Sequence, residues 1–169
     1  EFEAQNAPLR TATIKAAAEE IEKVLRKGSL GDFLRFAHRN PELSEPERRA
    51  AYRYLGAFWN QFHQEAKAAS DGSLLDVIEH EDAGALIFQI VSTAQDKHLE
   101  LNPLILMRDK QGWSIAPGVT TGGNFAKLGK ASQEQQAEVH RRFENQRENL
   151  TKKATADLRR RFGKAAPVE

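Results

Sequence analysis

Four short segments of alternating polar and apolar residues between positions 74 and 116 limit what this chain can fold into. They read LLDVIEH (74–80), ALIFQIVST (85–93), HLELNPLILMR (98–108) and WSIA (113–116). A period of two residues, rich in β-branched and aromatic types, predicts strands. The linkers between them are four residues long, and such short loops join antiparallel neighbours, because parallel strands need a long crossover. The sequence therefore predicts an antiparallel meander of four strands.

The third segment has apolar residues on both of its predicted faces. One face carries Leu99, Leu101, Pro103, Ile105 and Met107. The opposite face carries Leu104 and Leu106 in the second half only, so we expect that half to be covered on both sides. Pro103 lies at the changeover. Because proline cannot donate to a strand ladder, it predicts a bulge or an edge position. A bulge would bend the strand and make the sheet concave.

Three helices are predicted before the strands. Apolar residues at helical spacing indicate a helix over 9–27, and Ser29 can cap a second, shorter helix that ends before Pro41. Ser44 begins a third helix, which should run to about Ala69. The apolar seam of this third helix consists of Tyr52, Leu55, Trp59, Phe62 and Ala66.

The end of the chain combines a glycine-rich stretch with a basic helix. Residues 118–131 predict a loop or flap, and Ser132 opens a helix that could run to Arg161. Between positions 140 and 164 the net charge is +6, which leaves −5 for the rest of the chain. The apolar positions of this helix are sparse, so we expect it to lie along one edge of the sheet or to pair with another chain.

Composition excludes several kinds of chemistry. There is no cysteine, so disulfides, thiolate nucleophiles and cysteine zinc sites are all ruled out. The five histidines are isolated from one another in the sequence and show no spacing typical of a metal site. We therefore expect no metal and no cofactor. No apolar run reaches the roughly 20 residues that a membrane-spanning helix needs.

The stretch LILMRDKQGWSI, residues 104–115, carries a resemblance to a known family. Its order of strand, charged turn, Gly-Trp and strand resembles the end of the sheet in the nuclear transport factor 2-like (NTF2-like) superfamily. The resemblance covers residues 9–117, with 118–169 as an extension. It implies an α+β fold in which N-terminal helices pack on a strongly curved antiparallel sheet, followed here by a long C-terminal helix.

The same resemblance implies a division of the chain and a set of functions. Residues 1–118 would form a cone-like α+β domain with a pocket, 119–131 a loop or flap, and 132–169 a C-terminal helical extension. Members of the superfamily include isomerases, dehydratases, adaptors and bacterial envelope proteins without known activity, and a fold does not choose among them. A bacterial member of unknown function, located in the envelope or periplasm after removal of a signal, is the expectation.

The polar residues on the predicted strands are not expected to act as catalysts. If the apolar strand faces form the core, Gln89, His98, Glu100 and Asn102 look outward and are expected to be solvated. The cluster of His80, Glu81 and Asp82 lies in a predicted turn, where such residues are common for conformational reasons. None of these positions is assigned a catalytic role.

The function expected from the sequence is a non-enzymatic binding domain that holds a small apolar ligand or a peptide between the third helix and the sheet. Tryptophan and tyrosine are favoured as lining because their polar atoms need partners when buried. The ligand-binding residues predicted are Trp59, Trp113, Phe88, Leu101, Met107 and Tyr52. One alternative is a small isomerase or dehydratase that uses the same pocket. Another is an adaptor that dimerises or docks a partner through its basic helix; a homodimer stays open, and nucleic acid is not expected.

Overall fold

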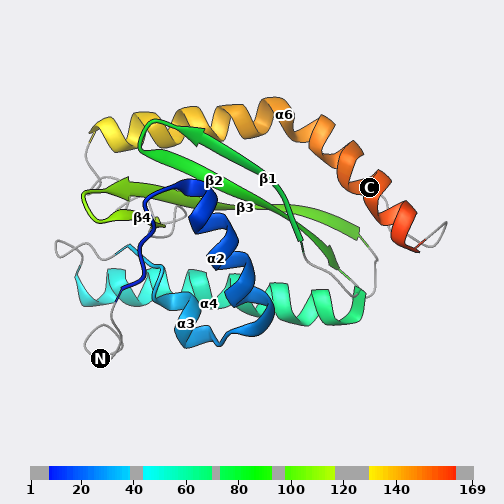
Figure 1. Cartoon of the computed structure of the whole chain (residues 1–169), viewed down its shortest axis with the longest axis horizontal. Helices are drawn as coiled ribbons and strands as arrows, with labels where there is room; N and C mark the ends of the chain where they lie inside the picture. The colour runs from blue at the N-terminus through cyan, green and yellow to red at the C-terminus, as the bar shows by residue number, and fades with distance from the viewer. Residues whose placement is uncertain (1–7, 39–43, 70–72, 93–97, 117–129, 163–169) are drawn as a thin grey trace.

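The computed structural model describes residues 8–38, 44–69, 73–92, 98–116 and 130–162, and Figure 1 shows their arrangement. A four-stranded sheet lies between two helical layers. The elements are α2 (Ile14–Lys27), α3 (Leu30–Leu34), α4 (Glu45–Ala69), β1 (Ser73–His80), β2 (Ala83–Ser92), β3 (His98–Asp109), β4 (Gly112–Ile115) and α6 (Lys130–Phe162).

The sheet is the predicted meander. Its strands follow one another in the order β1-β2-β3-β4, and every neighbouring pair is antiparallel. The turns that close β1–β2 and β3–β4 hold two residues each, so the strands extend further toward their turns than the sequence indicated. Glu81, in the first turn, has a φ of 55°, and Gly112, just after the second, has a φ of 122°.

The strongly curved sheet that the resemblance implied is not found, because the sheet is not strongly curled, and the bulge expected at Pro103 is absent as well. The register of β2 with β3 runs without a shift through the pair Ile87 and Pro103. The second alternative, an edge position, holds instead. β4 pairs with β3 only from Leu106 onward, so among the described residues Pro103 has β2 on one side alone. The missing N–H falls on this open side and costs no ladder bond.

The first core lies between the sheet and helices α2, α3 and α4. Strand residues of alternating positions, such as Leu86 and Phe88 on β2 and Leu104 on β3, meet the apolar side of α4 there. The buried residues of this first core are Ile14, Ala17, Ala18, Ile21, Leu25, Phe33, Phe36, Ala37, Leu55, Phe58, Phe62, Leu86, Phe88, Leu104, Leu106, Trp113 and Ile115.

A second core lies on the opposite face of the sheet, beneath α6. Its buried residues are Ile78, Ala83, Ala85, Ile87, Val139, Phe143 and Leu150. The expectation that α6 lies along an edge is therefore wrong, since Val139, Phe143 and Leu150 pack on the sheet face. The prediction that the second half of β3 is covered on both sides is confirmed, because Leu104, Leu106 and Met107 are all buried.

The helix ends show where local sequence decides the structure. Ser29 and Asp32 form the predicted capping box at the start of α3. The helix predicted over 9–27 begins only at Ile14, because Thr11 forms a bridge with Trp113 of β4. The second helix ends at Leu34, well before Pro41, because the residues that follow turn toward the sheet. The predicted loop over 118–131 lies almost entirely outside the described residues.

Candidate functional site

Four of the six predicted ligand-binding residues belong to the first core. Phe88 and Trp113 are 0% and 1% exposed, whereas Tyr52 and Trp59 are only partly buried against the same cluster. The Trp59 ring lies 5.7 Å from the ring of Phe33, measured between centroids. Tyr52 and Trp59 are thus the members that a ligand could contact, and Phe88 and Trp113 belong to the interior.

The structure does not bring the other two predicted residues, Leu101 and Met107, to this face. Leu101 packs against the second core, beneath α6. Met107 is paired with Ala83, which belongs to the same second core, and it alternates with Leu106 of the first. Successive residues of a strand point to opposite faces, so these two cannot line one hollow together with Phe88.

Gln89, Glu100 and Asn102 do not form the solvated face that the sequence predicted, and the side chain of His98 lies outside what the structure describes. Glu100 and Asn102 lie on the same face as Phe88, because Asn102 is paired with Phe88 in the β2–β3 register. Gln89 points to the other face, where it is 1% exposed and donates from Nε2 to Asp157 of α6 over 3.0 Å. The expectation failed because β3 has apolar residues on both faces, so apolarity alone does not decide which face is outward.

Glu100 and Asn102 form a cluster with one residue of α4. Gln61 donates from Nε2 to a carboxylate oxygen of Glu100 over 2.6 Å, and its Oε1 accepts from Asn102 over 2.8 Å. The carboxamide of Gln61 is therefore fixed at both ends. We call Gln61, Glu100 and Asn102 the α4–β3 polar cluster. Its one titratable group is the Glu100 carboxylate. Gln61 was not among the residues predicted from the sequence.

The α4–β3 polar cluster borders an aromatic wall. Phe88 makes edge-to-face contacts with Phe58 and Phe62 of α4, at centroid distances of 5.6 and 6.0 Å. Gln61 stands next to Phe62 on α4, and Asn102 stands opposite Phe88 on the sheet. Apolar and aromatic walls with a few oriented polar groups are typical of sites for small molecules. This margin of the first core is the candidate site.

Ser114, His38 and Asp109 come together at the end of β4 and resemble a catalytic triad in residue type only. The Ser114 hydroxyl lies 3.5 Å from Nδ1 of His38, and the Asp109 carboxylate lies 3.6 Å from the same nitrogen. A working triad needs the hydroxyl on one ring nitrogen and the carboxylate on the other. Ser114 is also only 1% exposed. This arrangement does not support nucleophilic catalysis.

The surroundings of His38 disfavour its protonated form. Burial lowers the pKa of His38 below its usual value, the nearby Asp109 carboxylate partly opposes this, and the Arg10 guanidinium adds to the lowering. Arg10 is held in place by hydrogen bonds to the carbonyl oxygens of Arg35 and Ala37, at 3.1 and 2.8 Å. His38 is thus a neutral, structural histidine where its segment joins β4.

This environment predicts how stability depends on pH. Well above pH 6.5 His38 is neutral in both the folded and the unfolded chain, so it contributes nothing to the pH dependence there. As the pH falls below 6.5 the unfolded chain takes up a proton first, and the free energy of unfolding decreases until the lowered folded pKa is reached. His38→Gln should flatten part of this acid-side loss in urea titrations. The same change at the exposed His140 should leave it intact; equal profiles for both variants would contradict the assignment.

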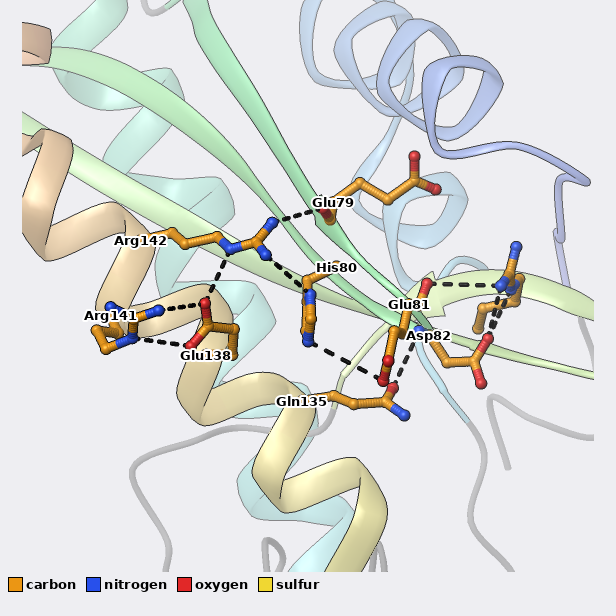
Figure 2. A network of polar contacts seen from close by, with 9 residues as sticks. Glu79, His80, Glu81, Asp82, Gln135, Glu138, Arg141 and Arg142 are labelled. Atoms are coloured by element: carbon orange, nitrogen blue, oxygen red, sulfur yellow. Dashed lines mark hydrogen bonds and ion pairs between the residues drawn. The ribbon is translucent and has the colours of Figure 1, made fainter.

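The turn residues His80, Glu81 and Asp82 take part in a polar network that attaches α6 to the β1–β2 hairpin (Figure 2). Arg142 of α6 lies 3.1 Å from Nδ1 of His80, and its guanidinium only donates, so this nitrogen is the acceptor. The main-chain N–H of Asp82 donates to Gln135 over 2.9 Å. The network holds two elements together and presents no open reaction site.

The charges of α6 are largely paired within the helix. Hydrogen bonds from Arg141 and Arg142 lower the pKa of Glu138 to about 2. Further pairs three or four residues apart join Glu144 with Arg147 and Glu148 with Lys152. Exposed pairs of this kind contribute little to the stability of the fold. The basic side chains of α6 therefore determine the charge of its surface more than the stability of the fold.

Among the residues that the structure describes, no three histidine, aspartate or glutamate side chains are grouped so that they could hold a metal ion. None of the described helices is long and apolar enough to cross a membrane.

Comparisons with known proteins concern the fold. A crystal structure described as "Putative NTF2-like transpeptidase", from Campylobacter jejuni, is similar to this chain with a TM-score of 0.41 and 13% sequence identity. The similarity covers 62% of this chain and 97% of that one. No protein-family model and no curated protein matches the sequence. The words NTF2-like and transpeptidase are both said of the Campylobacter protein.

Proposed function

We propose that this chain is a non-enzymatic binding domain for a small apolar ligand or an apolar peptide segment. The observation that carries the proposal is the α4–β3 polar cluster, a carboxylate and two carboxamides bonded to one another on the helix-covered face of the sheet. Polar groups on such a face are costly unless they are satisfied or used. Here they adjoin the aromatic wall formed by Phe62 and Phe88.

The ligand is proposed to lie at the margin of the first core. Phe58, Phe62 and Phe88 fill the space between α4 and the sheet, since all three are buried. The side of β3 around Asn102 and Pro103 has no partner strand among the described residues, and the ligand is proposed to approach from that side. Trp59 and Tyr52, partly exposed on another flank of α4, are the remaining predicted contacts.

A dye-binding experiment tests this proposal. The neutral apolar dye Nile red should bind the native chain saturably and raise its melting temperature by mass action. Gln61→Ala releases both partners of the cluster and should weaken dye binding about fivefold, as expected for about 1 kcal/mol. Asn60, the exposed residue next to Gln61, offers a matched control, because Asn60→Ala should leave dye binding unchanged. Absence of saturable binding to the native chain would contradict the proposal.

The alternative of a small isomerase or dehydratase is favoured by one observation. Glu100 supplies a carboxylate on the covered face, positioned by Gln61, as a general base would require. Glu100→Gln should then abolish turnover of a carbonyl substrate while leaving dye binding within about twofold. If Glu100→Gln and the native chain show the same turnover of every carbonyl substrate that binds, the chain is better described as a binding domain.

The adaptor alternative uses the solvent face of α6. Arg141, Arg147 and Lys152 are exposed there, and acidic residues of the same helix pair with each of them. An acidic partner would have to compete with these internal pairs, which makes this use of the chain weaker than ligand binding. Exchanging these three for glutamine and measuring the mass of the native chain by light scattering would detect a dimer that depends on them.

A further inference from the structure

The free edge of β1 is occupied by side chains from both helical layers. Within the part of the chain that the structure describes, β1 is the first strand of the sheet and has β2 on one side only. The two-residue turn pairs His80 with Ala83, and such a turn is closed by a hydrogen-bonded pair. Because hydrogen-bonded and non-bonded pairs alternate, the main-chain groups of Glu79 and Val77 point away from β2.

Three hydrogen bonds reach the main chain of this strand from helices. Arg142 of α6 donates to the carbonyl oxygen of Glu79 over 3.3 Å (Figure 2). Lys153, three helical turns further along α6, donates to the carbonyl oxygen of Leu75 over 3.3 Å. From the other layer, Glu22 of α2 accepts from the N–H of Leu74 over 3.1 Å. Side chains thus satisfy groups that a neighbouring strand would otherwise bind.

The strand itself carries two further features of a protected edge. Its register with β2 shifts between Leu74 and Asp76, and a bulge of this kind twists an edge away from regular pairing. Asp76 and Glu79 also place acidic residues on a short strand, another common protection. An open edge is a template for pairing with other chains, and natural sheets block it by such means.

We infer that Arg142 and Lys153 keep the β1 edge closed against a second copy of this chain. This inference goes beyond the proposed function, whose ligand lies near β3 and not at the β1 edge. If two β1 strands paired antiparallel about Val77, Glu79 would face Leu75 of the other copy and Asp76 would face Ile78, so no two acidic residues would meet. The carbonyl groups of Leu75 and Glu79 lie two residues to either side of Val77, so the edge is self-complementary. Those same two groups are the ones that Lys153 and Arg142 occupy.

A pair of double variants tests the inference. R142Q/K153Q removes both donors, whereas R141Q/K152Q changes charge equally at the adjacent positions, whose side chains pair with Glu138 and Glu148. We expect R142Q/K153Q to double its mass in light scattering, while the native chain and R141Q/K152Q stay monomeric. Hydrogen exchange should slow at the amides of Val77 and Glu79 in the associated form alone.

A third change identifies the surface. Val77→Pro, added to R142Q/K153Q, removes an outward N–H without breaking a bond to β2, and should restore the monomer. Arg142 also contacts His80 and Glu138, so the single variant K153Q, checked for folding by circular dichroism, is measured as well and should associate more weakly. The inference is overturned if R142Q/K153Q and K153Q fold and stay monomeric, if R141Q/K152Q associates equally, or if association survives Val77→Pro.

Discussion

Gly112→Ala should lower the free energy of unfolding by about 3 kcal/mol, because the backbone there admits no side chain. Gly112 has a φ of 122°, a region that L-residues rarely adopt. A Cβ at this position would collide with the carbonyl oxygen of Thr11 and lie 3.0 Å from its carbonyl carbon. That same oxygen accepts the N–H of Trp113 over 2.9 Å, so the collision would also break the bridge between the N-terminal segment and β4.

Thermal unfolding measures this loss. For a chain of this size we expect the melting temperature to fall by roughly 6–12 °C. Gly56→Ala is the matched control, since an added Cβ meets nothing within 4 Å in the middle of α4. Alanine is about 1 kcal/mol more favourable than glycine in a helix, so this control should be stabilising. Two variants that change stability in the same direction would show that the backbone at Gly112 is not the cause.

Trp113→Ala should cost about 3–5 kcal/mol, which approaches the whole stability of many domains. Its ring is 1% exposed, and the Arg108 guanidinium covers it at 5.4 Å from the ring centroid. The neighbouring strand residues cannot collapse into the space left behind, because they are held by the ladders on both sides. The variant should therefore keep only a small part of the native chain's stability and unfold at a much lower urea concentration.

The second tryptophan provides the comparison. Trp59 is only partly buried and stacks on the rings of Phe33 and His63, so Trp59→Ala should cost about 1–2 kcal/mol. Urea unfolding with a common slope would separate the two losses. Similar losses for Trp113→Ala and Trp59→Ala would contradict the assignment of Trp113 to the interior and of Trp59 to the accessible flank.

The elements whose formation depends on residues close together in the sequence could be predicted from it. The alternation of residues 74–116 gives four antiparallel strands, Ser29 caps its helix, and the long third helix ends at Ala69. The position of Pro103 shows the limit of this reasoning. A bulge and an open edge can each accommodate a residue that has no N–H. The length of β4 decides which of the two forms.

The candidate site could be predicted only in part, for a related reason. The third strand has apolar side chains on both faces, so the direction of Glu100 follows from the pairing of Asn102 with Phe88 and not from the strand's own period. Gln61 has no distinguishing pattern in the sequence, because its role depends on β3, about 40 positions along the chain. The grouping of His38 with Ser114 likewise arises from a bridge between distant segments.

The placement of α6 over the second core has a consequence for biosynthesis. The meander joins sequence neighbours, so β1 to β4 can pair as soon as they leave the ribosome. The face that carries Ile78 and Ile87 then stays bare until Val139 and Phe143 have been translated. Exposed apolar surface of this kind attracts chaperones and promotes aggregation in nascent chains. A stalled or truncated product that lacks the last helix should therefore be a chaperone client.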